Sequence, residues 1–235
     1  MNRPSRPNLP NPRRPLVVTA AIVVAVLIAL VSMSGFYADW LWYQSVNFTN
    51  VWSITLTTKA LLFVLFGATT SLSIVTNIFI AYRRRPLYVP LSIEADNLER
   101  YRGQIEPIRR LVTGGLALVL FYFAGTAGTQ LWTSWMLFQN STPFGVKDPQ
   151  FGLDISFFAF RLPFWQALLE WGISTIIISI IAAGVVHYLY GGIRLQVRED
   201  RTTVTARVQL SILLGIVVLL KGMAYWLDRY HLALK

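Results

Sequence analysis

Two residues of opposite charge fall inside long apolar stretches, where burying a charge is expensive. Glu170 lies six residues after Phe164, which begins one stretch, and Lys221 lies six residues before Leu227, which ends another. At a helical rise of about 1.5 Å per residue, both charges lie about 9 Å from the same boundary. Matched depth and opposite sign predict an intramembrane ion pair, because pairing spares each charge an isolated burial. The alternative is that both side chains snorkel outward or border a water-filled vestibule.

The other titratable residues offer weaker chemistry. Lys59 precedes a complete apolar stretch and is expected to snorkel to the interface. His187 lies near the end of its stretch and is expected to be interfacial, with a proton relay as the alternative. The other histidine, His231, is expected on the opposite side, which argues against a two-histidine metal site. Asp148 and Asp154 lie in a turn-rich loop, where aspartates usually cap the backbone.

Enzymatic motifs are missing from the sequence. It contains no phosphate-binding loop, nucleophile elbow, HExxH motif or dinucleotide fingerprint. It contains no cysteine, which excludes disulfides, thiolate catalysis and cysteine-ligated metals. We therefore predict that the chain is not an enzyme and holds no cofactor or metal.

The composition indicates a membrane protein. Hydrophobic residues make up 54% of the chain and charged residues 14%, against about 25% charged residues in soluble domains. A bilayer core requires about 20 apolar residues per helix, and five stretches approach that length: 16–37, 56–82, 111–132, 164–190 and 208–227. The first is too long for a signal peptide, whose apolar region spans about 7–15 residues. Because a bilayer demands internal backbone pairing, the predicted fold is an all-α polytopic transmembrane bundle.

Basic residues predict the orientation of these spans. Of the 21 basic residues, 15 lie before the first span, between the second and third, or between the fourth and fifth. Because such an excess marks the cytoplasmic side, we predict a multi-pass cell-membrane protein with a cytoplasmic N-terminus and residue 235 outside. The positive charge is then explained by contact with the anionic inner leaflet, and no nucleic-acid partner is required.

The shorter connections have distinct compositions. Residues 1–15 form a Pro- and Arg-rich tail, which is expected to be disordered and cytoplasmic. The connection 83–110 places apolar residues on one helical face and predicts an amphipathic helix on the inner leaflet, or alternatively a docking surface for a cytosolic partner. On the outer side, Trp40, Trp42 and Tyr43 predict an interfacial aromatic belt, with a ligand-stacking surface as the alternative.

The longest outer connection, residues 133–163, combines turn residues with aromatic residues. Its second half predicts an interfacial or re-entrant segment, and six phenylalanines argue for an ordered cap over the outer face. The residues that define this loop motif are Asp148, Pro149, Phe151, Asp154, Phe157, Arg161 and Pro163.

Small residues predict where helices approach one another. Ala124 and Gly128 have small-xxx-small spacing in the third span, and Ser179 and Ala183 have it in the fourth. This spacing predicts packing contacts and carries no chemistry.

Three aromatic segments, 38–46, 144–164 and 225–230, resemble hallmarks of a bacterial integral-membrane family, uncharacterised protein family 0182. The resemblance covers essentially the whole chain. It implies a longer protein, with about seven N-terminal spans followed by a large extracytoplasmic domain. The chain is therefore expected to be a fragment of the membrane region, and the resemblance carries over no activity, cofactor or catalytic residue.

The leading functional hypothesis is a membrane anchor or scaffold for a larger envelope protein, with other membrane or envelope proteins as partners. The alternative is a transporter or channel fragment with a polar pathway near Glu170 and Lys221. A transporter should gather polar span residues around one mid-bilayer void, whereas an anchor should pack its spans tightly.

Overall fold

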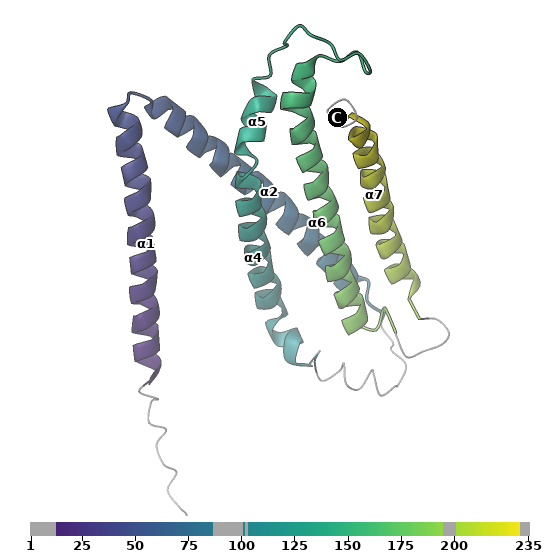
Figure 1. Cartoon of the computed structure of the whole chain (residues 1–235). Helices are drawn as coiled ribbons and strands as arrows, with labels where there is room; N and C mark the ends of the chain where they lie inside the picture. The colour runs from purple at the N-terminus through teal and green to yellow at the C-terminus, as the bar shows by residue number, and fades with distance from the viewer. Residues whose placement is uncertain (1–12, 87–100, 102, 195–200, 231–235) are drawn as a thin grey trace, which may run out of the picture. The chain divides into compact units, whose positions relative to one another are not determined.

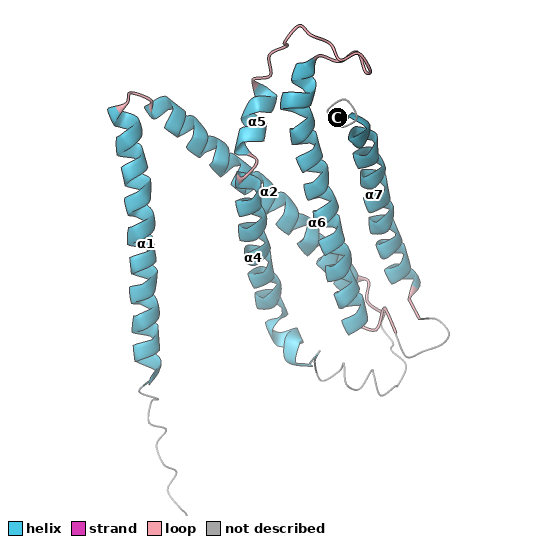
Figure 2. Ribbon diagram, in the orientation of Figure 1, coloured by secondary structure: helices cyan, strands magenta, loops and turns pink. Residues whose placement is uncertain are grey.

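The computed structural model describes residues 13–86, 101, 103–194 and 201–230. The described residues form helices joined by turns, and no strand longer than an isolated bridge occurs among them (Figure 2). Contacts divide the chain into two compact units, Met1–Leu56 and Thr57–Lys235. The predicted all-α class is confirmed.

The first unit contains α1 (Arg13–Ser45) and the first turns of α2 (Thr49–Arg83). The chain turns between them at Asn47, whose φ is 60°. Phe36 of α1 contacts Trp52 of α2, with ring centroids 5.0 Å apart. Apolar side chains along α1 are exposed, with Val31 at 74%, as expected for a helix whose surroundings are lipid.

The second unit holds the remaining elements (Figure 1). In chain order they are the rest of α2, the 3₁₀ turn η1 (Glu106–Ile108), α4 (Arg109–Thr129), α5 (Trp132–Gln139), the π-helical turn η2 (Phe157–Arg161), α6 (Leu162–Leu189) and α7 (Val204–Asp228). Pro163 lies in the first turn of α6, where its missing N–H leaves no helix bond unmade.

Glycines allow α2 and α4 to touch along their backbones. A Cβ atom on Gly67 of α2 would lie 2.6 Å from the carbonyl oxygen of Phe121 in α4. A Cβ on Gly128 of α4 would lie 2.6 Å from Cβ of Phe66 in α2. The predicted packing role of Gly128 is confirmed, and its buried neighbour at this contact is Gly125.

A second contact joins α2, α6 and α7. Ala81, Ala183 and Leu213, one from each helix, form a buried apolar cluster. Ser179 and Ala183 are both fully buried, which confirms the packing predicted for this pair. Small side chains let the helices approach closely enough for their polar groups to meet.

Within the second unit, the helix ends that lie together are those predicted to lie on the same side of the membrane. Tyr82 near the end of α2 and Tyr190 after α6 both bind Glu106, which precedes α4. The hydroxyl of Thr205, in the first turn of α7, donates to the Arg84 carbonyl at 3.2 Å. The ends of α2 and α6 and the starts of α4 and α7 therefore lie together.

Several boundaries differ from the predicted ones: α1 runs to Ser45, α2 begins at Thr49 and α7 begins at Val204. The third span ends at Thr129, and the separate helix α5 occupies residues predicted as loop. Helix α1 begins at Arg13, so the last three residues of the predicted tail are helical. Residues 1–12 of that tail, and residues 87–100 and 102 of the predicted amphipathic helix, lie outside the described residues.

Candidate functional site

The loop between α5 and η2 closes on itself. Lys147 and Asp154 form an isolated antiparallel bridge, and the Asp148 amide donates to the Leu153 carbonyl at 2.8 Å. The turn passes through Gly152, whose φ of 67° lies in the left-handed region that glycine tolerates. The sequence Asp148 to Gly152 is therefore a tight turn with a fixed backbone.

Two aspartates hold this loop through backbone amides. The Asp154 carboxylate accepts from the amides of Phe144, Gly145 and Ser156 at 3.0, 2.9 and 2.8 Å. A side-chain hydrogen bond from Ser156, followed by these amides, lowers the pKa of Asp154 to about 2. Asp148 accepts from the Phe151 amide at 2.7 Å. Both aspartates are thus backbone caps, as expected for turns.

The loop packs against the end of α7 through an aromatic cluster, which we call the Tyr230 cap. Tyr230 is 5% exposed, and its ring centroid lies 5.0, 5.4 and 6.0 Å from those of Phe151, Phe157 and Phe158. Arg229 donates to the Tyr230 hydroxyl at 2.6 Å. Segments more than 60 residues apart in sequence therefore share one small core.

The remaining residues of the loop motif lie around this cap. Arg161 donates from Nε to the Ser141 hydroxyl at 3.0 Å, which ties η2 to the segment after α5. Pro149 is exposed within the turn. None of these contacts brings a second titratable group to Asp148 or Asp154 in the described part of the chain.

The structure does not bring Glu170 and Lys221 together. Both side chains are exposed, and the ion pairs formed among residues 13–86, 101, 103–194 and 201–230 do not include either of them. Their helices α6 and α7 nevertheless pack together. The geometry corresponds to the alternative of two separately exposed charges.

The predicted aromatic belt lies on the last turns of α1. Trp42 is 59% exposed, and its ring contacts Tyr43 edge to face with centroids 4.9 Å apart. Trp40 stacks on Tyr37 at 5.7 Å. These rings, of which Trp42 is exposed and Trp40 and Tyr43 are half-buried, suit headgroup depth.

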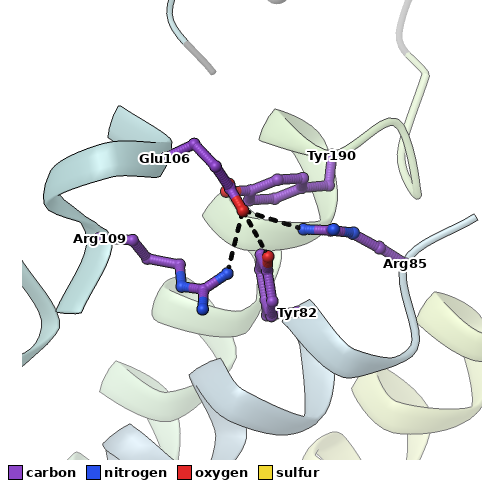
Figure 3. Close-up of polar contacts among 5 residues, drawn as sticks. All are labelled: Tyr82, Arg85, Glu106, Arg109 and Tyr190. Atoms are coloured by element: carbon purple, nitrogen blue, oxygen red, sulfur yellow. Dashed lines mark hydrogen bonds and ion pairs between the residues drawn. The ribbon is translucent and has the colours of Figure 1, made fainter. Parts of the chain in front are cut away.

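A cluster not anticipated from the sequence surrounds Glu106 (Figure 3). We call it the Glu106 clamp, and its members are Tyr82, Arg85, Glu106, Arg109 and Tyr190. One carboxylate oxygen, Oε1, accepts from the Tyr82 hydroxyl at 2.6 Å and lies 3.1 and 3.7 Å from Nη1 of Arg109 and Arg85. The other oxygen accepts from the Tyr190 hydroxyl at 2.8 Å. One carboxylate thereby joins the ends of three helices.

Aromatic rings set the position of the two arginines. The guanidinium carbons of Arg85 and Arg109 lie 4.2 and 3.8 Å from the centroid of Tyr82, within the range of cation–π contacts. Tyr190 packs edge to face against Tyr82 at 5.1 Å. Burial, followed by its hydrogen bond to Glu106, raises the pKa of Tyr190 to about 12, so this hydroxyl remains a donor.

Polar side chains also line the interface of α2 with α6 and α7. This polar seam comprises Thr70, Ser73, Asn77, Trp171, Thr175, Ser179, His187 and Gln209. Its members bind one another across the helices.

Two examples show the pairing within the seam. Trp171 donates to Thr70 at 2.9 Å. His187, which is 1% exposed, lies 3.0 Å from the side-chain oxygen of Gln209. His187 is therefore a buried residue that joins α6 to α7, two residues before α6 ends, and its interfacial depth stays a prediction.

A sequence signal for the seam existed. Thr70, Ser73 and Asn77 recur at intervals of three and four residues, which places them on one face of α2. The Glu106 clamp had no comparable signal, because its members span 190 − 82 = 108 positions of the sequence, from Tyr82 to Tyr190. Among the described residues, no group of three or more His, Asp or Glu side chains could hold a metal ion.

Among the residues that the structure describes, five helices are long and apolar enough to cross a membrane, which defines the chain as a polytopic α-helical membrane protein. The chain belongs to the Uncharacterised protein family (UPF0182), which matches residues 16–235. The resemblance inferred from the aromatic segments is confirmed.

Relatives from three bacteria illustrate the match. UPF0182 proteins of Streptomyces coelicolor and Nocardioides sp. are each 44% identical, over 94% and 93% of this chain, and one of Thermobifida fusca is 40% identical over 97%. The chain spans 22%, 22% and 23% of their respective lengths. No solved structure matches the chain.

Proposed function

We propose that this chain is the membrane-anchoring part of a larger envelope protein and has no enzymatic activity of its own. The proposal is supported by the small share, about a fifth, that the chain spans of its curated relatives. In this view, the membrane helices hold a region that those longer proteins carry beyond the matched segment.

The pairing of the polar seam is the observation that carries the proposal. Thr70 and Thr175 are 4% and 6% exposed, and their hydroxyl oxygens lie 3.3 Å apart. The Gln209 amide donates to the Asn77 carbonyl at 3.0 Å. Such pairs join helices in a bilayer because an unpaired polar group in hydrocarbon is costly. Polar residues whose side chains pair with one another between helices favour a static scaffold.

The proposed setting is the bacterial cell membrane, with the N-terminus in the cytoplasm and residue 235 outside. The distribution of arginines supports this orientation. The Glu106 clamp would then face the anionic inner leaflet, and the Tyr230 cap would face outward. Proposed partners are lipids and other envelope proteins, without nucleic acid.

A reporter fusion tests the orientation. Alkaline phosphatase, which is active only outside the cytoplasm, is fused after Lys235, and a second fusion is made after Arg85. We expect activity in the membrane fraction from the first fusion and none from the second. Equal activity from both fusions would refute the proposed threading.

A second candidate function is transport, because polar residues within spans can also line solute pathways. The pathway expected near Glu170 and Lys221 gains no support from these two exposed residues. Proteoliposomes containing the full chain separate the two functions. An anchor gives proton and sodium fluxes equal to those of empty liposomes, whereas flux abolished by Gln209→Leu would establish transport.

A further inference from the structure

The Glu106 clamp lies where lipid headgroups meet the ends of membrane helices. Tyr82 is one residue before the last residue of α2, and Tyr190 directly follows α6. Glu106 lies three residues before α4 begins. At a rise of about 1.5 Å per residue, each position is within about 5 Å of the end of an apolar helix. This depth places the clamp beside lipid phosphates.

The clamp has more positive than negative charge. Arg85 and Arg109 share the single carboxylate of Glu106, which leaves a net charge of 2 − 1 = +1. Three exposed arginines, Arg83, Arg84 and Arg110, adjoin it. Over residues 83–110 and 194–207 the sequence holds 11 arginines and six acidic residues, for a net charge of 11 − 6 = +5. The clamp therefore lies in a positive region.

Both arginines keep guanidinium N–H donors beyond those that contact Glu106. A guanidinium group carries five N–H donors in a planar fork that matches two oxygens of a phosphate. In the described part of the chain, Arg85 and Arg109 each contact Glu106 through Nη1 alone. Their side chains are 39% and 33% exposed, and both guanidinium groups lie over the ring of Tyr82. Two partly exposed guanidinium groups thus lie side by side at the ends of the helices.

We propose that the Glu106 clamp binds the phosphate of an anionic phospholipid through Arg85 and Arg109, and that Glu106 competes with this phosphate. The headgroup phosphate accepts from the free edges of both guanidinium groups. The Glu106 carboxylate holds the arginines in place but also reduces their positive charge. The site therefore discriminates against zwitterionic lipids, and its affinity is limited by its own carboxylate. This inference does not depend on the anchoring role.

The amount of lipid that the protein retains in detergent tests the site. A micelle without anionic lipid has no surface potential of its own, so retention reports binding to the protein. The full chain is titrated with phosphatidylglycerol, and bound lipid is counted by native mass spectrometry, with phosphatidylcholine as the comparison lipid. We expect one retained phosphatidylglycerol and at least tenfold weaker retention of phosphatidylcholine, about the effect of one or two oriented basic groups. Equal retention of both lipids would overturn the proposal.

Two double variants of equal charge separate this site from general attraction. Arg85→Gln/Arg109→Gln removes the forks, and Arg83→Gln/Arg84→Gln removes two neighbouring charges. We expect about a 30-fold loss of retention for the first variant, since each basic group contributes about fivefold, and less than about threefold for the second. Equal losses would show non-specific attraction and refute the site. Circular dichroism of both variants verifies that the helices persist.

A third variant tests competition by the carboxylate. Glu106→Gln keeps a side chain of the same shape but removes its charge, so retention of phosphatidylglycerol should rise by about fivefold. Unchanged or weaker retention in a folded variant would refute the competing role of Glu106. Inorganic phosphate at millimolar concentration distinguishes the source of the phosphate: displacement of the lipid by free phosphate would overturn the assignment to a headgroup.

Discussion

The Glu106 clamp and the Tyr230 cap lie at opposite ends of helix α6 and fasten different neighbours by different physical means. The clamp joins α2, α4 and α6 through one carboxylate, two hydroxyls and two guanidinium groups. The cap joins α7 to η2 and the preceding loop through four aromatic rings, two of them on side chains only 5% exposed. Polar fastening responds to salt and to charged ligands, whereas aromatic burial does not. The contacts of the clamp should therefore weaken or strengthen with salt and charged ligands, whereas those of the cap should stay the same.

The largest effect is expected at the cap. Tyr230→Ala removes a buried ring surrounded by three phenylalanines and should lower the free energy of unfolding by about 3–5 kcal/mol. Denaturation with SDS in mixed micelles measures this loss. The matched control is Tyr225→Ala near the end of α7, where the ring is 73% exposed, with an expected change within about 0.5 kcal/mol. Equal losses of unfolding free energy in the two variants would mean that the Tyr230 cap does not form a buried core.

The next effect is expected between the two ends, at the contact of α2 with α4. Gly128→Ala places a Cβ 2.6 Å from Cβ of Phe66 and should lower the free energy of unfolding by about 1–3 kcal/mol. Gly115→Ala, whose Cβ would meet nothing within 4 Å, should be neutral or stabilising in the same SDS titration. If Gly128→Ala leaves the free energy of unfolding unchanged, the contacts at the ends of the helices alone hold α2 and α4 together.

A smaller effect is expected at the clamp. Glu106→Gln removes two ion pairs on a side chain that is 44% exposed, so the free energy of unfolding should fall by about 0.5–1 kcal/mol. Raising the salt concentration to about 0.5 M should shrink this difference. Glu170→Gln is the control, because it makes the same chemical change at an exposed glutamate outside the ion pairs of the described residues. A difference that is independent of salt would contradict the ionic description of the clamp.

The smallest effect is local to the loop beside the cap. The pKa of Asp154 is lowered from 3.8 to about 2, so its ordering of the loop is complete above pH 3.8 and is lost as the pH falls through about 2. Pepsin should cleave Asp154→Asn faster than the native loop at pH 4, and the two rates should converge near pH 2. Asp228→Asn, at the exposed last residue of α7, should be cleaved like the native chain at both pH values. No difference at pH 4 would contradict the capping role.

The comparison of cap and clamp also explains what could be anticipated from the sequence. The loop motif was recognisable because Asp148, Asp154 and the phenylalanines lie within a few residues of each other, and turn geometry depends on neighbouring residues. Tyr230, to which those phenylalanines pack, was recognised only as part of another aromatic segment. The clamp was missed because its residues come from one connection and from the ends of two distant helices, α2 and α6, and a glutamate between arginines carries no periodic pattern.

The ion pair illustrates the limit of reasoning from depth. Matched positions along two helices fix the height of Glu170 and Lys221, but the rotation of each helix about its axis decides where the side chains point. That rotation is set by the packing of Ala183 against Leu213 and by the pairing of His187 with Gln209. Neither contact can be derived from the length of an apolar stretch.

The sequence by itself determined the all-α class, the five apolar helices and the family, because the requirement for backbone pairing in lipid acts on each segment separately. Only the tertiary structure decided which polar groups meet: the carboxylate of Glu106 with two tyrosines and two arginines, and His187 with Gln209. The physical reason is that apolar length is a property of one helix, whereas a hydrogen bond between helices depends on their register, their rotation and the closeness that glycine permits.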